Sequence, residues 1–288
     1  MCINKRIQYP ENQKERMMEL GVMIGLNDDI EHELEQLARL GFHACQLFCW
    51  TPKMYTEQTA QRVLTALDRY GIHITTLWCG WTGPAVWNFY EGQKTLGLVP
   101  EQYRAQREKD LIAGSDFGKL LGVSQIATHA GFLPEDPTLP TYEEVVRVLR
   151  RIALHCKQNG QYFMFETGQE TPVTLLRTIQ DIGTDNLGVN LDPANLILYG
   201  KANPVDALDT IGKYVRDVHA KDGCYPTNGR EIGVETVLGE GQVDFPALIA
   251  KLKAMGYDGP VTIEREISGE EQIADILKAK ALLEQCIG

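Results

Sequence analysis

Short apolar runs alternate with segments of helical periodicity along almost the whole chain. Residues 20–25 form the first apolar run, and after it Ile30, Leu34 and Leu37 recur at helical spacing. Further short runs that predict strands are 44–50, 74–79, 125–130, 161–165, 187–191, 214–218 and 260–263. Strands that alternate with helices in this way predict a parallel sheet that is covered by helices.

Local signals mark where several of the predicted helices begin. The pair Thr171-Pro172 combines a capping residue with a proline at the first helical position. Thr141 with Glu144, and Ser268 with Glu271, have the spacing of a capping box, in which the two side chains and the helix backbone bond reciprocally. These signals place helix starts between the predicted strands, as a regular strand–helix alternation requires.

The number of units favours a single closed barrel. Eight strand–helix units fit within 288 residues, and a (β/α)8 TIM barrel needs about 250. An open doubly wound sheet is the alternative, because periodicity does not show closure. No glycine-rich dinucleotide fingerprint follows the first strand, which weakens that alternative. We therefore expect residues 19–288 to form one TIM-barrel domain, with residues 1–18 as an N-terminal arm.

Composition narrows the classes of function. A net charge of −11 disfavours a broad surface for nucleic acid or anionic membrane, because phosphate binding needs clustered cations. The first residues are polar and charged, and no apolar run is long enough to span a membrane. Seven cysteines occur without a Cys-x-x-Cys pair, as in a reducing cytosol. We expect a cytoplasmic protein that binds neither nucleic acid nor membrane.

Polar side chains stand where four of the predicted strands end. These residues are Glu166, Asp192, His219 and Glu264. Asp192 comes 26 residues after Glu166, and His219 comes 27 residues after Asp192, close to the roughly 31 residues of an average barrel unit. Because the carboxyl ends of barrel strands meet at one end, we expect one shared site there.

The period-2 alternation of strands agrees with this placement. If the four strand-end residues point inward, the positions two residues earlier also do: Met164, Asn190, Asp217 and Thr262. The positions between them then face the helices: Phe165, Leu191, Val218 and Ile263. Apolar residues are thus assigned to the helix-facing side in every case.

Three carboxylates crowded at one end of a barrel need a positive charge between them. A divalent cation meets this need, and oxygen ligands with one imidazole suit Mn²⁺ first, then Mg²⁺, with Co²⁺ or Zn²⁺ as alternatives. Four protein ligands leave about two coordination positions open for adjacent substrate oxygens. The alternative is that each residue has a separate structural role. Four matched positions favour the metal site.

The same residues lie within motifs that resemble a known family. These motifs are Phe-Glu-Thr-Gly at 165–168, Asn-Leu-Asp-Pro-Ala-Asn at 190–195, Val-His-Ala-Lys-Asp-Gly at 218–223, Gly-Glu-Gly-Gln-Val-Asp-Phe at 239–245 and Gly-Tyr-Asp-Gly-Pro-Val-Thr-Ile-Glu at 256–264. In this order the chain resembles the xylose isomerase-like TIM barrels. That group of sugar (phosphate) isomerases and epimerases includes the ketose 3-epimerases.

The resemblance implies a catalytic site. Such relatives hold one divalent metal on residues matching Glu166, Asp192, His219 and Glu264, and those matching Glu166 and Glu264 form the acid/base pair. The chain would then be a metal-dependent sugar isomerase or epimerase that acts on a keto-sugar or sugar phosphate through a metal-bound enediolate. A small-molecule sugar is the expected partner, and relatives often form homodimers or homotetramers.

Other residues are candidates for substrate binding, each with a structural alternative. They are His129, Asn195, Lys221, Arg230, Glu170 and Trp81, with Trp50 beside Trp81 as part of an apolar wall. Taken one at a time, each of these residues is explained equally well by a structural role: a core histidine, a turn cap, a solvated charge or a core aromatic residue. The long aromatic loop after the third strand is a further candidate, either for the site or for a subunit contact.

Three other functions remain open. A lyase or dehydratase, acting on an inosose or a 3-keto-glycoside, would use the same enolate chemistry for elimination. An endonuclease IV-like repair enzyme would need a histidine-rich metal cluster and a basic face, which six histidines and the charge of −11 disfavour. A barrel kept as a binding or scaffold protein would not need the complete set of ligands.

Overall fold

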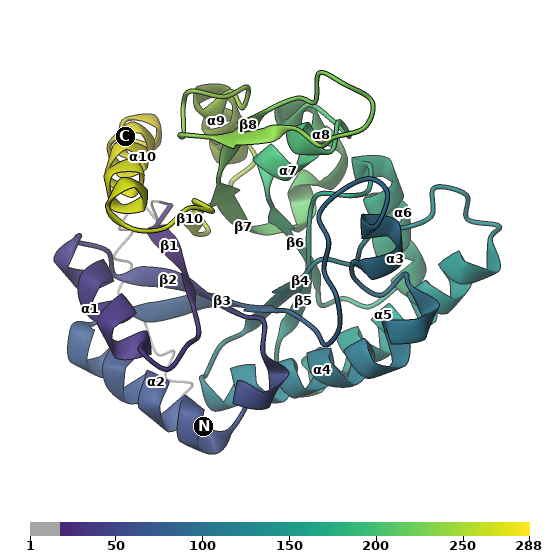
Figure 1. The fold of residues 1–288 in the computed structure, drawn as a ribbon, viewed down its shortest axis with the longest axis horizontal. Coiled ribbons are helices and arrows are strands. Elements are labelled where there is room, and N and C mark those ends of the chain that lie inside the picture. Colours follow the sequence, from purple (N-terminus) through teal and green to yellow (C-terminus); the bar gives the residue numbers. More distant parts are fainter. Residues whose placement is uncertain (1–17) are drawn as a thin grey trace, which may run out of the picture.

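A computed structural model describes residues 18–288, and in it eight parallel strands close into a barrel (Figure 1). The order around the barrel is β1-β10-β7-β6-β5-β4-β3-β2. Its strands are β1 (Leu20–Gly25), β2 (Ala44–Cys49), β3 (His73–Cys79), β4 (Gln125–Thr128), β5 (Tyr162–Glu166), β6 (Leu187–Leu191), β7 (Val215–Ala220) and β10 (Val261–Ile263). The closed order confirms the predicted TIM barrel and excludes the open sheet.

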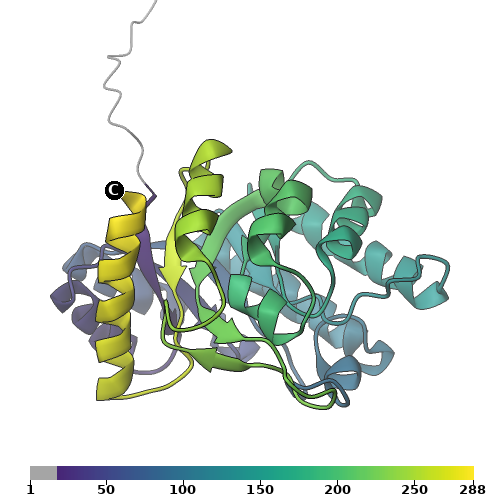
Figure 2. The same ribbon diagram turned by 90° about the horizontal axis from the view of Figure 1, so that it is seen from above.

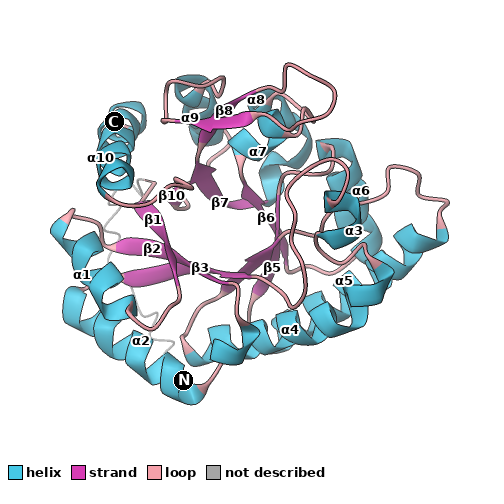
Figure 3. Cartoon of the chain, in the orientation of Figure 1, coloured by secondary structure: helices cyan, strands magenta, loops and turns pink. Residues whose placement is uncertain are grey.

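Helices surround this barrel (Figure 3). The longer ones are α1 (Ile30–Arg39), α2 (Glu57–Tyr70), α4 (Glu101–Leu120), α5 (Pro140–Gln158), α6 (Pro172–Ile182), α8 (Pro204–Ile211), α9 (Phe245–Ala254) and α10 (Glu270–Ile287). The short elements are α3 (Gly92–Thr95), α7 (Pro193–Leu198), η1 (Pro52–Met54) and η2 (Gly212–Tyr214). An antiparallel hairpin of β8 (Asp222–Cys224) and β9 (Val234–Thr236) lies at the end of the barrel opposite the C-terminus (Figure 2).

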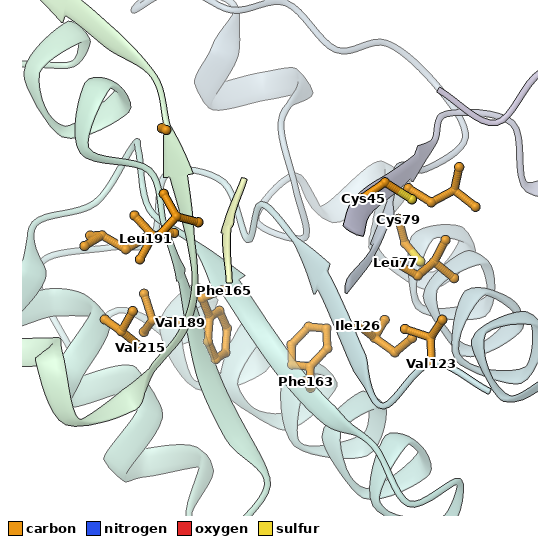
Figure 4. Close-up of a cluster of buried hydrophobic side chains, with 14 of the residues drawn as sticks. Cys45, Leu77, Cys79, Val123, Ile126, Phe163, Phe165, Val189, Leu191 and Val215 are labelled. Atoms are coloured by element: carbon orange, nitrogen blue, oxygen red, sulfur yellow. The ribbon is translucent and has the colours of Figure 1, made fainter. Parts of the chain in front are cut away.

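The alternation of side chains along the strands is as the sequence predicts. Phe165 and Leu191 pack with other apolar side chains between strands and helices (Figure 4). Inside the barrel, Asp217 is fully buried and accepts hydrogen bonds from Thr76 Oγ1 at 2.7 Å and Thr262 Oγ1 at 3.0 Å. Burial raises the pKa of Asp217, although these donors oppose the rise. A polar layer therefore fills the barrel below the strand ends.

One predicted helix start is right and the two capping boxes are wrong. Thr171 caps α6 by accepting from the Thr174 amide at 3.3 Å. Proline at position 140 starts α5 one residue before Thr141, so Glu144 is free to bind Arg104 at 2.6 Å instead. At α10 the capping residue is Gly269 with φ 85°, and no side chain caps that helix.

The aromatic loop between β3 and α4 is held by one buried arginine. The Arg107 guanidinium donates to the carbonyl oxygens of Thr82 at 3.2 Å and Pro84 at 2.9 Å. It also donates to those of Thr95 at 2.8 Å and Gly97 at 2.6 Å. Four carbonyl groups from distant points of the loop thus share one fixed cation.

The predicted N-terminal arm lies almost wholly outside the described residues. Residues 1–17 of the predicted arm lie outside them, and Met18 is buried in the core. The cysteines among residues 18–288 are free thiols. Within the same part of the chain, every helix is too short or too polar to cross a membrane.

Candidate metal and active site

The structure brings the four strand-end residues to one point at the carboxyl end of the barrel. Glu166 is the last residue of β5 and His219 lies near the end of β7, while Asp192 and Glu264 directly follow β6 and β10. One potential ligand atom from each residue lies within 4.8 Å of the other three. Glu166, Asp192 and His219 are buried, and Glu264 is 11% exposed. The four residues that sequence spacing assigned to one site therefore do lie together in the structure.

The histidine presents one ring nitrogen to the carboxylates. His219 Nδ1 lies 2.7 Å from Glu264 Oε2, 3.4 Å from Glu166 Oε1 and 3.8 Å from Asp192 Oδ2. Its other nitrogen, Nε2, lies 2.8 Å from the side-chain oxygen of Gln46. Asn190 Nδ2 lies 2.9 Å from the same nitrogen. With the hydrogen on Nε2, the ring donates to the Gln46 oxygen, because a carbonyl oxygen only accepts. The Nδ1 lone pair then faces the carboxylates, as a metal-binding histidine requires.

The cluster favours positive charge at its centre. Burial disfavours the charged form of His219, but Glu264 and Glu166 outweigh it and raise the pKa of the ring well above its usual value. Burial also opposes ionisation of Glu166. The neighbouring His129 and His219 outweigh that effect and hold the pKa of the carboxyl well below its usual range. The charges around this point therefore favour positive charge at the centre of the cluster.

Unpartnered buried atoms show that a divalent cation fits. Asp192 Oδ2, His219 Nδ1 and Glu264 Oε2 are buried and make no hydrogen bond, although Nδ1 lies 2.7 Å from Glu264 Oε2 and 3.8 Å from Asp192 Oδ2. Leaving such atoms unpaired costs free energy, and native proteins rarely do so without a reason. Together with Glu166 they offer three carboxylates and one imidazole, the donor set that suits Mn²⁺ or Mg²⁺ and also admits Zn²⁺ or Co²⁺.

A buried lysine lies on the outer side of this cluster. Lys221 is 2% exposed, and its Nζ lies 3.2 Å from Glu264 Oε1, 3.6 Å from Asp192 Oδ2 and 2.7 Å from Glu266 Oε1. Burial alone would lower its pKa, but these carboxylates raise it well above the usual value. The ammonium thus occupies one oxygen of Glu264 and leaves the other directed at His219.

Three donors hold the carboxylate of Glu166. Trp78 Nε1 donates to its Oε2, and Asn195 Nδ2 donates to its Oε1 at 3.3 Å. His129 Nε2 lies 3.2 Å from Oε1. The predictions included Asn195 and His129, and the structure places both at this carboxylate.

Sequence reasoning missed two residues of the site, Trp78 and Gln46. Trp78 is an inward position of β3 near its carboxyl end, and period-2 alternation could have identified it. Gln46 is a fully buried amide in the middle of an otherwise apolar strand. A polar residue at such a position is itself a signal, because burying an amide is costly without a partner.

A pocket of about 420 Å³ opens next to the four residues. Of the predicted site residues, those that line it are Glu166, Glu264, His129, Asn195 and Trp50. The pocket also has an arginine in its wall, Arg265 in the loop after β10, which was not predicted.

Four predicted substrate-binding residues do not line this pocket, among them Lys221, which pairs with three carboxylates. Arg230 is exposed in the loop between β8 and β9. Trp81 is buried, with the Arg107 guanidinium 5.0 Å from its ring centre. Glu170 is 3% exposed, and burial raises its pKa to about 7. These residues belong to the surface or to the interior behind the pocket.

Comparison with known proteins identifies one family of TIM barrels that the chain matches over most of its length. The family model described as xylose isomerase-like TIM barrel matches residues 34–286. A xylose isomerase domain protein from Planctomyces limnophilus is 34% identical, with a TM-score of 0.86 over 94% of this chain and 97% of that one. An uncharacterized protein of Methanocaldococcus jannaschii is 25% identical, over 93% of this chain and 89% of its own length.

A structure with a defined sugar ligand shares the fold at lower identity. D-psicose 3-epimerase from Clostridium cellulolyticum H10, solved with D-tagatose, is 17% identical with a TM-score of 0.67. The match covers 94% of this chain and 99% of that one. At this identity the likeness shows the barrel architecture alone.

Proposed function

Because the chain belongs to the xylose isomerase-like TIM barrel family, we propose that it is a divalent-metal-dependent isomerase or epimerase of a keto-sugar. The observation that carries the proposal is the convergence of Glu166, Asp192, His219 and Glu264, whose ligand atoms lie within 4.8 Å of one another. The pocket beside them gives a small molecule access to this point. The psicose epimerase with the same fold supports a sugar as the substrate.

The metal would be held by the carboxylates of Glu166, Asp192 and Glu264 and by Nδ1 of His219. Mn²⁺ is the cation we propose first, with Mg²⁺ next, because both prefer oxygen-rich donor sets. When bound, such a cation acts as a Lewis acid that stabilises negative charge on a carbonyl oxygen while the neighbouring carbon loses its proton. Gln46 supplies an acceptor for the hydrogen on Nε2 in the histidine tautomer that this role needs.

Glu166 and Glu264 are the residues that move the proton. The pKa of Glu166 is held well below its usual range, so it is ionised and able to accept a proton at neutral pH. Trp78 and Asn195 fix the direction of that carboxylate. Lys221 holds Glu264 in the same way, at 3.2 Å. One carboxylate takes the proton and the other returns it, to the opposite face in epimerisation or to the next carbon in isomerisation.

Proton exchange with solvent tests this assignment. The wild-type protein with Mn²⁺ should incorporate deuterium from D₂O beside the carbonyl of a keto-sugar, followed by proton NMR. Glu166→Gln and Glu264→Gln should each lower the exchange rate by 10²-fold or more. Glu240→Gln, which changes an exposed carboxylate, should exchange normally. Wild-type rates in both site variants would reject these roles.

Elimination is a second candidate reaction, and His129 favours it. This histidine lines the pocket and lies 3.2 Å from Glu166 Oε1. Burial lowers its pKa, but the charge of Glu166 outweighs burial and raises it, so the ring is a source of a proton for a leaving oxygen. Mass spectrometry of the products distinguishes the two reactions, because elimination removes water or releases a fragment and epimerisation changes no mass.

A further inference from the structure

The pocket is larger than the chemistry of a single sugar ring requires. Its volume of about 420 Å³ falls within the roughly 300–1,000 Å³ that proteins use for drug-sized ligands. Glu166, His129, Asn195 and Glu264 form only one part of its wall. The rest of the wall can contact a part of the substrate that does not react.

Much of that second part of the wall is apolar, although Arg265, Glu266 and Gln272 also belong to it. On one side Trp50 follows β2 and Trp87 follows β3, and these rings are 39% and 37% exposed. Leu198 of α7 and Ile232 between β8 and β9 also line the pocket. Strands β2 and β3 lie across the barrel from β6 and β7, so these aliphatic side chains face the two tryptophans.

The tryptophans are held in fixed positions. Trp50 packs edge-on against Trp87, with ring centres 6.2 Å apart, and against the buried Trp78 at 4.8 Å. Trp87 also packs against His129 at 5.0 Å. The loop that carries Trp87 is the one anchored by Arg107. A rigid aromatic surface of this kind binds flat, weakly polar groups well.

The cations near the pocket are already neutralised. Among the described residues that line the pocket, Arg265 is the one arginine and none is a lysine. It pairs with Glu235 at 3.0 Å and with Asp275 at 3.0 Å. Lys221, just behind the wall, lies within 4 Å of three carboxylates. A phosphate group would add negative charge here without a free partner, which disfavours a phosphorylated substrate.

We propose that the substrate is an unphosphorylated keto-sugar joined by a glycosidic bond to an aromatic group. This inference rests on the proposed function, because it places the keto-sugar at Glu166 and Glu264. The aromatic group lies between Trp50 and Trp87 on one side and Leu198 and Ile232 on the other. Contacts with a part of the substrate that does not react can raise the rate at the reacting carbon, so the free sugar is the poorer substrate.

Three substrates and three variants test the proposal, with deuterium incorporation beside the carbonyl as the readout. The substrates are the 4-nitrophenyl glycoside of a 3-keto-hexose, the free 3-keto-hexose and its 6-phosphate. The wild-type protein with Mn²⁺ should show at least tenfold higher kcat/KM for the aryl glycoside than for the free sugar. The phosphate should be the poorest of the three substrates.

The variants separate the subsite from the rest of the pocket. Trp50→Ala and Trp87→Ala should each lower the ratio of aryl glycoside to free sugar kcat/KM by about tenfold. Tyr90→Ala, on the same loop, 58% exposed and outside the pocket wall, should leave the ratio unchanged. Trp50→Phe should retain most of the ratio. Calorimetry checks that each variant is folded, and Trp50→Phe keeps the test decisive if an alanine variant is not.

Each result leads to one decision. A wild-type ratio near one, a preference for the phosphate, or a ratio unaffected by both tryptophan variants overturns the aromatic subsite while the proposed function stands. Absence of exchange with all three substrates overturns this inference. Absence of exchange with a free ketose such as D-psicose as well rejects the proposed function itself.

Discussion

Glu170 gives the most quantitative prediction for this barrel. It follows Gln169 in the loop between β5 and α6 and is 3% exposed. Burial raises its pKa from 4.5 to about 7, while the nearby charge of His129 opposes the rise. A carboxyl with a raised pKa keeps its proton in the folded state at a pH where the unfolded chain has lost it.

The sign and size of the effect follow from this difference. Between pH 4.5 and about 7 the folded state binds more protons at Glu170 than the unfolded state does, so stability falls as the pH rises. The difference between 4.5 and about 7, at about 1.4 kcal/mol per pKa unit, gives a destabilisation of about 3 kcal/mol above pH 7. Glu170→Gln removes the titrating group and should remove this loss.

Chemical denaturation of the metal-free protein in EDTA measures the effect. The variant and the wild type are unfolded with urea at intervals from pH 4.5 to pH 8. Relative to its value at pH 4.5, the stability difference should shift in favour of Glu170→Gln by about 3 kcal/mol at pH 8. Glu240→Gln, at an exposed position, serves as the control. A difference that stays constant with pH, or shifts in favour of the wild type, would refute the reasoning.

Three further substitutions test how the site and its loops are held. Gln46→Leu removes the acceptor 2.8 Å from His219 Nε2 and should weaken Mn²⁺ binding by about 10–100-fold in calorimetric titrations; unchanged affinity would contradict the tautomer assignment. Asp222→Ala removes a carboxylate that accepts from four backbone amides in the loop after β7, and should cost about 2–4 kcal/mol in urea unfolding. Arg107→Ala should cost about 3 kcal/mol or more and speed hydrogen exchange in the aromatic loop, whereas Arg151→Ala, at an exposed ion pair, should cost less than about 1 kcal/mol.

Much of the fold could be predicted because one constraint shapes every strand. A barrel strand packs one face on the helices and the other inside, so its sequence alternates, and its carboxyl end leads to the site. This is why Glu166 and His219 could be assigned to one cluster before any coordinates. Their matched spacing reflects the repeat of the strand–helix unit.

Contacts that cross the barrel could not be predicted from the same pattern. Gln46 contacts His219, which lies 173 positions later in the chain, and Trp78 contacts Glu166, which lies 88 positions later. Periodicity gives the direction of a side chain but does not identify its partner on another strand. Arg230 was a candidate for substrate binding with a solvated charge as its alternative, and in the structure it is exposed. Arg265 lies in the wall instead.

The local sequence pattern around Asp192 also did not show that one residue can have two roles. Asp192 starts α7 by accepting from the Asn195 amide at 2.8 Å through Oδ1, while its Oδ2 accepts no hydrogen bond and lies 3.6 Å from Lys221 Nζ. The sequence suggested either a ligand or a turn cap near these residues, and one carboxylate can serve both. The helix α7 was not predicted, because its six residues are too few to show a period.

Anomalous diffraction from crystals soaked in Mn²⁺ tests the central claim most directly. We predict one strong peak at the carboxyl end of the barrel, about 2.0–2.4 Å from oxygens of Glu166, Asp192 and Glu264 and from Nδ1 of His219. The peak should be absent from crystals of the Asp192→Asn variant that retain the same fold. A peak elsewhere, or no peak with these four side chains placed as described, would contradict the account.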